Sequence, residues 1–319
     1  MSSKIKIGVW LPTFGGWLIN APVEEPEISY NYVKKVAIEA ENLGYDSLWM
    51  ADHMLNPRKG ERIKALEGWT TLTAVAACTS QIKLGNAVLC QAFRYPAILA
   101  KMAATLDEIS NGRFIFSIGS GWFKREFEAY GIPWNDPVEL TERAKEQIKI
   151  IKALWTEDRV DFNGKYYHLI GGIMEPKPVQ KPCPPIWYGG NSDKSRQLIA
   201  DTNDIDGWFM SAVTIDEANQ RISDMVSRLK GRVLEYATYA FTLVSSTESE
   251  GEEEIRKLSN NNASTIQWAL KPGLVGTPSK IAESIYGFEE AGINHITLMF
   301  SSTLNDIRVF SDQVLKLLR

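Results

Sequence analysis

The chain has 319 residues, of which 44% are hydrophobic and 23% are charged, and its formal net charge is −4. This is the composition of a globular protein with a large core. The chain lacks the basic excess that nucleic acid or an anionic membrane surface requires, so we expect neither as a partner.

Strand and helix patterns alternate along the first half of the chain. Apolar runs predict strands at 6–11, 46–51 and 82–90, and a buried strand in the stretch 112–122 that ends in Gly-Ser-Gly. Amphipathic patterns predict helices at 30–43, 69–79, 96–109 and 139–155. Two helix boundaries carry their own signals, because Gly44 suits a helix end and Pro96 a first helical turn.

The second half begins with a break in this rhythm. Residues 160–168 predict a hairpin that turns at Asn163-Gly164, and a proline-rich connector covers 176–185. Strands are then predicted at 186–188, 206–210, 236–244 and 293–300, and helices at 192–202, 215–229, 278–291 and the C-terminus.

Eight strands outside the hairpin, mostly joined by helices, favour a closed parallel (β/α)8 TIM barrel with insertion segments. We expect residues 1–319 to form a single domain of this kind. An open doubly wound sheet is the alternative.

The cysteines and the N-terminus indicate a cytoplasmic protein. Cys78, Cys90 and Cys183 are an odd number without paired spacing, which argues against a disulfide framework or a zinc site. No signal-peptide pattern precedes the first strand, and no apolar run approaches ~20 residues.

In a barrel, the segments that follow the strands meet at one face, where ligands bind. Glycines, hydroxyls, aromatics and one histidine gather there, in Thr13-Phe14-Gly15, Asp52-His53, Leu89-Cys90-Gln91, Ser120-Gly121-Trp122, Gly189-Gly190-Asn191-Ser192 and Met210-Ser211. This set has no cluster of metal ligands and no nucleophile elbow. It suits a flat organic cofactor, which bare glycine backbone would let approach closely.

Two of these segments have a specific candidate role. Gly189 to Ser192 stand between a strand and a helix, so backbone N–H groups and the helix dipole would favour a phosphate there; a plain tight turn with a serine cap is the alternative. His53 can move a proton near neutral pH, or be a structural histidine paired with Asp52.

Aromatic and basic residues near these ends have two interpretations each. Trp10, Trp17, Trp122 and Phe123 are candidates for the walls of a ring site or for ordinary packing. The basic loop of Arg58, Lys59, Arg62 and Lys64 would receive an anionic substrate or cofactor tail, or is a solvated surface.

Five blocks of sequence resemble the bacterial luciferase-like family of flavin- and deazaflavin-dependent oxidoreductases. They are residues 44–53 (GYDSLWMADH), 95–107 (YPAILAKMAATLD), 110–113 (SNGR), 119–122 (GSGW) and 185–190 (PIWYGG). Residues 160–190 also resemble alkanesulfonate monooxygenase, but Tyr239 and Phe241 stand where those enzymes have an arginine and a histidine, which argues against sulfonate chemistry of that kind.

The resemblance implies a (β/α)8 barrel that holds FMN or a deazaflavin over the strand ends. It implies catalytic roles for His53 and Asp52, and places Trp122 and Glu126 at the border of the pocket. The cofactor-binding positions that it implies are Leu89, Cys90, Ser120, Trp122, Gly189, Gly190, Asn191 and Ser192. Relatives often have a strained or cis peptide at the segment that corresponds to Leu89-Cys90, and they are commonly homodimers.

Three functions follow from this resemblance. The first is a two-component monooxygenase, in which reduced FMN from a separate flavin reductase reacts with O2 to oxygenate a small organic substrate. The second is hydride transfer with the deazaflavin coenzyme F-420, and the third is a non-catalytic flavin-binding barrel. No motif identifies the substrate, and we expect the loops 17–27, 57–67 and 248–274 to shape its pocket, the last as a mobile lid.

Overall fold

The structure is a computed structural model that describes residues 3–15 and 28–319. Its centre is a ring of eight parallel strands in the order β3-β2-β1-β13-β10-β9-β8-β5, closed by pairing of β5 with β3. The strands are β1 (Lys6–Trp10), β2 (Ser47–Met50), β3 (Lys83–Asn86), β5 (Phe114–Gly119), β8 (Ile186–Gly189), β9 (Gly207–Phe209), β10 (Glu235–Phe241) and β13 (His295–Met299). This closure confirms the predicted (β/α)8 barrel over the open sheet.

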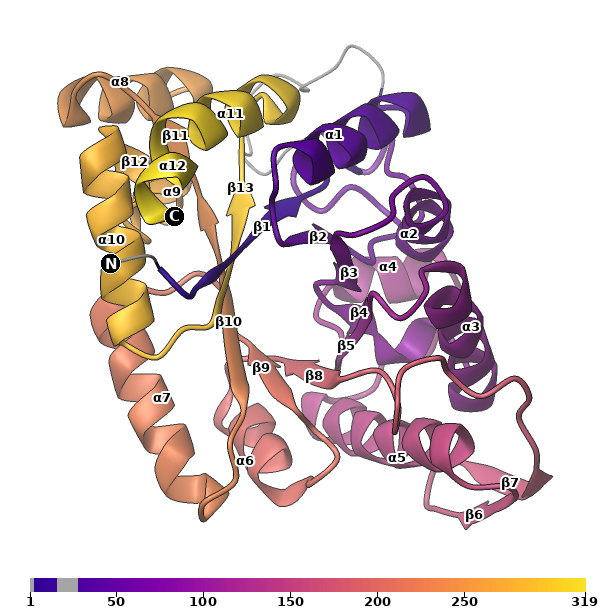
Figure 1. Ribbon diagram of the computed structural model, residues 1–319. Coiled ribbons are helices and arrows are strands. Elements are labelled where there is room, and N and C mark those ends of the chain that lie inside the picture. The colour runs from indigo at the N-terminus through magenta and orange to yellow at the C-terminus, as the bar shows by residue number, and fades with distance from the viewer. Residues whose placement is uncertain (1–2, 16–27) are drawn as a thin grey trace.

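Helices surround the ring on the outside, as Figure 1 shows. They are α1 (Tyr30–Asn42), α2 (Gly68–Ala76), α3 (Pro96–Ile109), α5 (Pro137–Thr156), α6 (Asp193–Asp201), α7 (Ile215–Leu229), α10 (Pro278–Glu290) and α11 (Thr303–Phe310). A π-helical turn (Ser311–Leu315) and α12 (Lys316–Leu318) end the chain. No described helix combines the length and apolar character that crossing a bilayer requires.

Several smaller elements interrupt the alternation. The predicted hairpin is present as β6 (Val160–Asn163) and β7 (His168–Gly172), at the periphery of the barrel (Figure 1). The predicted strand 82–90 is split by a cis peptide between Ala87 and Val88, after which β4 (Leu89–Cys90) pairs with β5. A 3-10 turn (Gln91–Phe93) follows β4, and α4 (Lys124–Ala129) follows β5.

The expectation of a long loop over residues 248–274 is wrong. The segment forms α8 (Glu248–Leu258) and α9 (Ala263–Leu270), between the paired strands β11 (Leu243–Val244) and β12 (Val275–Gly276). Both helices have side-chain caps, since Thr247 accepts from the Glu250 N–H and Asn262 accepts from the Thr265 N–H. Glu248 and Glu250 lie in the first turn of α8, where acidic residues interact favourably with the helix dipole.

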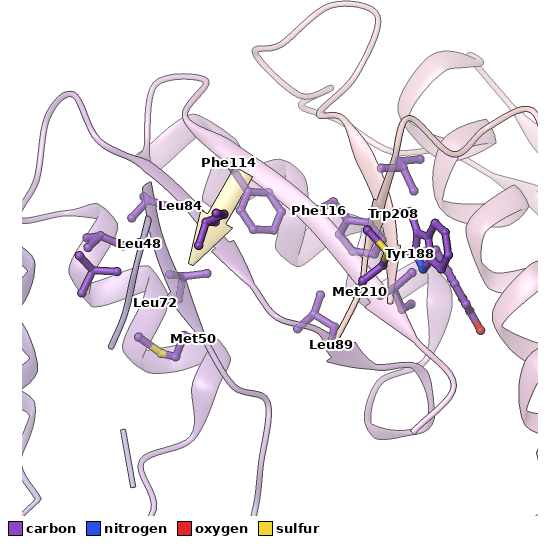
Figure 2. Packing of buried hydrophobic residues seen from close by; sticks show 14 of the residues in the cluster. Leu48, Met50, Leu72, Leu84, Leu89, Phe114, Phe116, Tyr188, Trp208 and Met210 are labelled. Carbon is purple, nitrogen blue, oxygen red and sulfur yellow. The ribbon is translucent and has the colours of Figure 1, made fainter. Parts of the chain in front are cut away.

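One core layer fills the space between the ring and the helices. Successive strand residues alternate between the two faces, so Leu48 and Met50 of β2 point outward with Leu84 of β3 toward Leu72 of α2 (Figure 2). The same layer continues through Phe114, Phe116, Tyr188, Trp208 and Met210, also drawn in Figure 2, all of them buried.

A second core layer fills the inside of the ring. Trp49 and Trp187 stack with ring centroids 5.3 Å apart, and Phe209 meets Trp49 edge-on at 5.0 Å. Glycines on neighbouring strands make the room: a Cβ on Gly85 would lie 2.5 Å from the Trp49 ring, and one on Gly207 would lie 2.5 Å from the Trp187 ring. The barrel interior is therefore packed solid at this level.

We predict that Gly85→Ala lowers the free energy of unfolding by about 1–3 kcal/mol. The added methyl group would overlap the Trp49 ring in a core that is already closely packed. Urea unfolding followed by circular dichroism measures the change. Gly172→Ala in β7 is the matched control, since its nearest neighbour is a Leu154 methyl at 3.3 Å. Equal stability of the two variants would contradict the proposed packing.

Candidate active site

A cavity of about 710 Å³ opens at the carboxyl ends of the barrel strands, a size within the range of small-molecule sites, roughly 300–1,000 Å³. All ten residues that the sequence predicts as site residues line it: Asp52, His53, Leu89, Cys90, Ser120, Trp122, Gly189, Gly190, Asn191 and Ser192. The structure thus brings together segments that follow β2, β3, β5 and β8.

Asp52 is engaged in a buried ion pair. Its two carboxylate oxygens accept from the two terminal nitrogens of Arg94, at 2.8 and 2.9 Å, and Oδ2 also accepts from the Cys90 N–H at 2.9 Å. Arg94 also donates to Glu67, the N-cap residue of α2. Burial alone would lower the pKa of Arg94, but the carboxylates of Asp52 and Glu67 outweigh it and raise that pKa. Asp52 therefore ties β2 to β4 and α2.

His53 has a different partner. Its Nδ1 lies 3.1 Å from both carboxylate oxygens of Glu126, a residue of α4 that is 2% exposed. Glu126 Oε1 also accepts from the backbone N–H groups of Met54 and Leu55, at 2.7 and 2.9 Å. A carboxylate in this position acts as an acceptor, which assigns the hydrogen to Nδ1 and leaves Nε2 as the nitrogen able to accept a proton.

The two neighbours Asp52 and His53 therefore do not form the pair that the sequence suggests. The sequence does place Glu126 at the pocket border, because it follows the 119–122 block, but nothing in its spacing indicates contact with His53. Arg94 was missed altogether, since it lies between a strand and a helix without a motif. Only the three-dimensional closure of β2, β4 and α4 brings these partners together.

Three glycines at the cavity are in close contact with side chains of the 87–90 segment. The Val88 side chain packs where a Cβ of Gly189 would stand, 2.6 Å away, and lies 2.8 Å from the Cβ position of Gly119. Gly121, at φ +90°, leaves space for the Cys90 sulfur. These glycines thus let the 87–90 segment lie across the strand ends as an apolar bed. Burial raises the pKa of the Cys90 thiol to about 12, so it is protonated at neutral pH.

A cluster of hydroxyl groups lies beside this bed. Ser120 Oγ is 2.6 Å from Tyr188 Oη and 3.2 Å from Thr141 Oγ1. Burial raises the pKa of Tyr188 to about 12, so the phenol keeps its proton and can donate.

The turn after β8 adds further donors next to the hydroxyl cluster. Ser192 caps α6 by accepting from the Ser195 N–H, and the two hydroxyls lie 2.9 Å apart. Gly190 is fixed because its carbonyl accepts from Trp208 Nε1 at 2.8 Å. Lys194, in the first turn of α6, lines the same end of the cavity.

Aromatic side chains form the remaining walls. His53 is met edge-on by Trp122 at 5.6 Å and by Phe14 at 6.1 Å, and Trp122 itself is 61% exposed at the rim. Trp10 and Tyr239 also line the cavity, and their rings meet edge-on at 5.5 Å. Trp17 lies outside the described residues.

The donor set fits a flavin. An apolar bed and aromatic walls suit a flat ring, while hydroxyls, a lysine and the N-terminus of α6 suit a phosphate. Within residues 3–15 and 28–319, no group of three or more histidine, cysteine or carboxylate side chains is arranged to hold a metal ion.

A family model described as luciferase-like monooxygenase matches residues 5–272. The chain belongs to the luciferase-like monooxygenase family. This confirms the family that the five sequence blocks indicate.

Relatives within this family use both kinds of cofactor. The FMNH(2)-dependent dimethylsulfone monooxygenase of Pseudomonas putida is 28% identical over 100% of this chain and 96% of its own length. The F420-dependent glucose-6-phosphate dehydrogenase of Amycolatopsis mediterranei (strain U-32) is 30% identical over 89% of this chain and 93% of its own. The luciferase-like chain is thus similar to enzymes that use either reduced FMN or F-420.

Solved structures agree on the fold. An F420-dependent secondary alcohol dehydrogenase, in complex with an F420-acetone adduct, matches with a TM-score of 0.80 and 21% identity over 100% of both chains. A riboflavin lyase, solved with modified FMN and riboflavin, matches with a TM-score of 0.84 and 16% identity, over 99% of this chain and 91% of that one. At these identities the likeness shows the luciferase-like barrel alone.

We predict that Asp52→Asn costs about 3 kcal/mol of stability, because it removes the buried one of the two carboxylates that pair with the Arg94 guanidinium and leaves only the more exposed Glu67. The expected result for His53→Asn is a loss below 1 kcal/mol, since that side chain lies at the cavity surface. Thermal unfolding of both variants measures the difference. If the two variants were equally stable, Asp52 would not have the structural role described here.

Proposed function

We propose that this protein is a flavin-dependent monooxygenase, which uses reduced FMN and O2 to oxygenate a small organic substrate. The cavity carries the proposal, because it combines an apolar bed for a ring, phosphate donors at one end and an oriented histidine at the wall. The relatives that depend on FMNH2 support this choice.

The proposed phosphate site consists of Ser192, Lys194 and the hydroxyls around Tyr188, with the ring against Val88 and Leu89. When bound, reduced FMN would supply the electrons that activate oxygen. The residues of the chain hold this group, exclude water with Trp122 and Trp10, and place His53 at the wall.

His53 is the proposed acid–base residue. Glu126 fixes the ring through Nδ1, so Nε2 receives or delivers the proton on the cavity side. We propose for Asp52 a positioning role, since its carboxylate is engaged by Arg94 and the Cys90 N–H and thereby holds the 87–90 segment in place.

We further propose that the chain is a single-domain, cytoplasmic homodimer served by a separate flavin reductase. The FMNH2-dependent relative supports the separate reductase, since such an enzyme needs a supply of reduced FMN. Light scattering of the purified protein measures the oligomeric state, and a monomer would contradict the dimer.

The cofactor assignment is tested by anaerobic titration of the purified protein with reduced FMN and with reduced coenzyme F-420, followed by fluorescence. We expect saturable binding of reduced FMN at least tenfold tighter than binding of F-420. Binding of F-420 without affinity for FMN would replace this proposal with hydride transfer. Binding of neither would indicate a non-catalytic barrel.

We predict that His53→Ala lowers kcat about 100-fold or more while the dissociation constant of FMN stays within twofold, because it removes one proton-transfer group from the wall. Product formation under saturating reduced FMN measures kcat. His168→Ala is the matched control, since His168 bonds to Asn163 in the peripheral hairpin. Unchanged turnover of His53→Ala would exclude the proposed role.

A further inference from the structure

A buried glutamine of α5 binds the backbone of a residue on which the cavity wall depends. Gln147 is 0% exposed, and its Nε2 donates to the Arg94 carbonyl at 2.8 Å. The guanidinium of the same arginine pairs with Asp52 in the wall of the cavity. Arg94 is therefore held through its backbone by α5 and through its side chain by the residue that follows β2.

The segment from Cys90 to Arg94 is short, and both of its ends meet the same carboxylate. Cys90 donates its N–H to Asp52 at 2.9 Å, and Arg94 donates to Asp52 at 2.8 and 2.9 Å. A 3-10 turn over Gln91–Phe93 joins the two ends. A shift of the Arg94 backbone is thus transmitted to Cys90 and to the apolar bed that this strand forms.

The residue before Gln147 in α5 holds the hairpin against the same turn. The carboxylate of Glu146 accepts from the N–H groups of residues 165–167, at 2.8, 3.0 and 3.2 Å. Tyr167 in this segment is 8% exposed, and its ring meets that of Tyr95 edge-on at 5.5 Å. Its hydroxyl lies 3.4 Å from Gln91 Oε1. Adjacent residues of α5 therefore link the hairpin and the 3-10 turn to one rigid helix.

The hydrogen bonding of Gln147 is incomplete for a buried amide. Among the residues that the structure describes, none donates to its Oε1. A buried acceptor without a donor costs stability, and a methionine of similar size would avoid that cost. An amide at this position is therefore better explained by its one bond, to the Arg94 carbonyl, than by its contribution to core packing.

We propose that Gln147 is a positioning residue for the flat ring of the bound cofactor. Its bond to Arg94 fixes the 3-10 turn, and through Cys90 it fixes the apolar bed on which the ring lies. This proposal rests on the proposed function, because it concerns the part of the cavity that is assigned to the flavin ring. It extends the flavin site to a residue of α5 that does not itself line the cavity.

Hydrogen–deuterium exchange of the flavin-free protein tests the positioning directly. Gln147→Met removes the donor and keeps a similar side-chain volume. We expect the peptide that covers residues 87–95 to exchange about fivefold faster than in the wild type, the effect of one lost hydrogen bond of ordinary strength. Exchange over residues 186–192, at the phosphate end, should not change. Equal exchange of the two proteins over 87–95 would overturn the proposal.

Titration with oxidised FMN and with riboflavin measures the consequence for binding. The two ligands share the ring, and riboflavin lacks the phosphate. We expect Gln147→Met to weaken both by the same factor, about five- to tenfold, and to shift the long-wavelength absorbance band of the bound flavin, because the bed under the ring has moved. Unchanged affinities, or a loss confined to FMN, would overturn the proposal.

Gln180→Met is the matched control. Gln180 also donates from Nε2 to a backbone carbonyl, that of Phe114 at 2.7 Å, but it does so at the amino end of β5. This variant should leave the exchange over 87–95 and both flavin affinities as they are in the wild type. Equal effects of the two variants would indicate a general loosening of the fold and would overturn the proposal.

The outcome is separable from that of the proposed function. If the wild type failed to bind FMN, the monooxygenase proposal would be contradicted, while faster exchange over 87–95 in Gln147→Met alone would still support the role of Gln147 in holding the bed. Normal FMN binding without this local change in exchange would contradict the positioning role alone.

Discussion

The stacked rings of Trp49 and Trp187 fill the barrel interior and so fix the level at which the cavity above them begins. The two rings fit inside the barrel because the neighbouring strands have glycines, which carry no side chain, at these positions. The rings leave no room for a ligand in the middle of the barrel. The cavity that the described residues form lies at the carboxyl ends, where Val88 and the following residues lie across the strand ends. The site therefore lies above the barrel core and is apolar at its base, which suits a flat ring lying on the strand ends.

Two adjacent residues in the wall of this site have different roles, one structural and one reactive. Asp52 is 5% exposed and holds Arg94, while His53, next to it in the cavity wall, is held by Glu126. Consecutive residues of an extended chain point to opposite sides, so one strand end can supply both a structural anchor and a reactive group. Because Asp52 is held rigidly, His53 has a defined position relative to a bound ring.

The sequence predicts the architecture well because periodicity and helix signals are local. All eight barrel strands, the hairpin and the helix that begins at Pro96 are where the patterns indicate. The cavity-lining residues were found because strand ends of a parallel barrel meet at one face. The partners of Asp52 and His53 could not be predicted in this way. Arg94 is 42 positions from Asp52 and Glu126 is 73 positions from His53, so these contacts depend on closure of the ring. The helices over 248–274 were missed because α8 is mostly charged and α9 is only eight residues long, so neither shows a long amphipathic pattern.

We propose that the barrel mouth holds a flavin with its phosphate at the start of α6. A crystal structure of the protein with FMN would show where the cofactor binds. We expect a ring against Val88 and Leu89, within reach of His53, and a phosphate on Ser192 and Lys194. Flavin density elsewhere on the protein, or with the phosphate turned to Arg58 in the cavity wall, would contradict it.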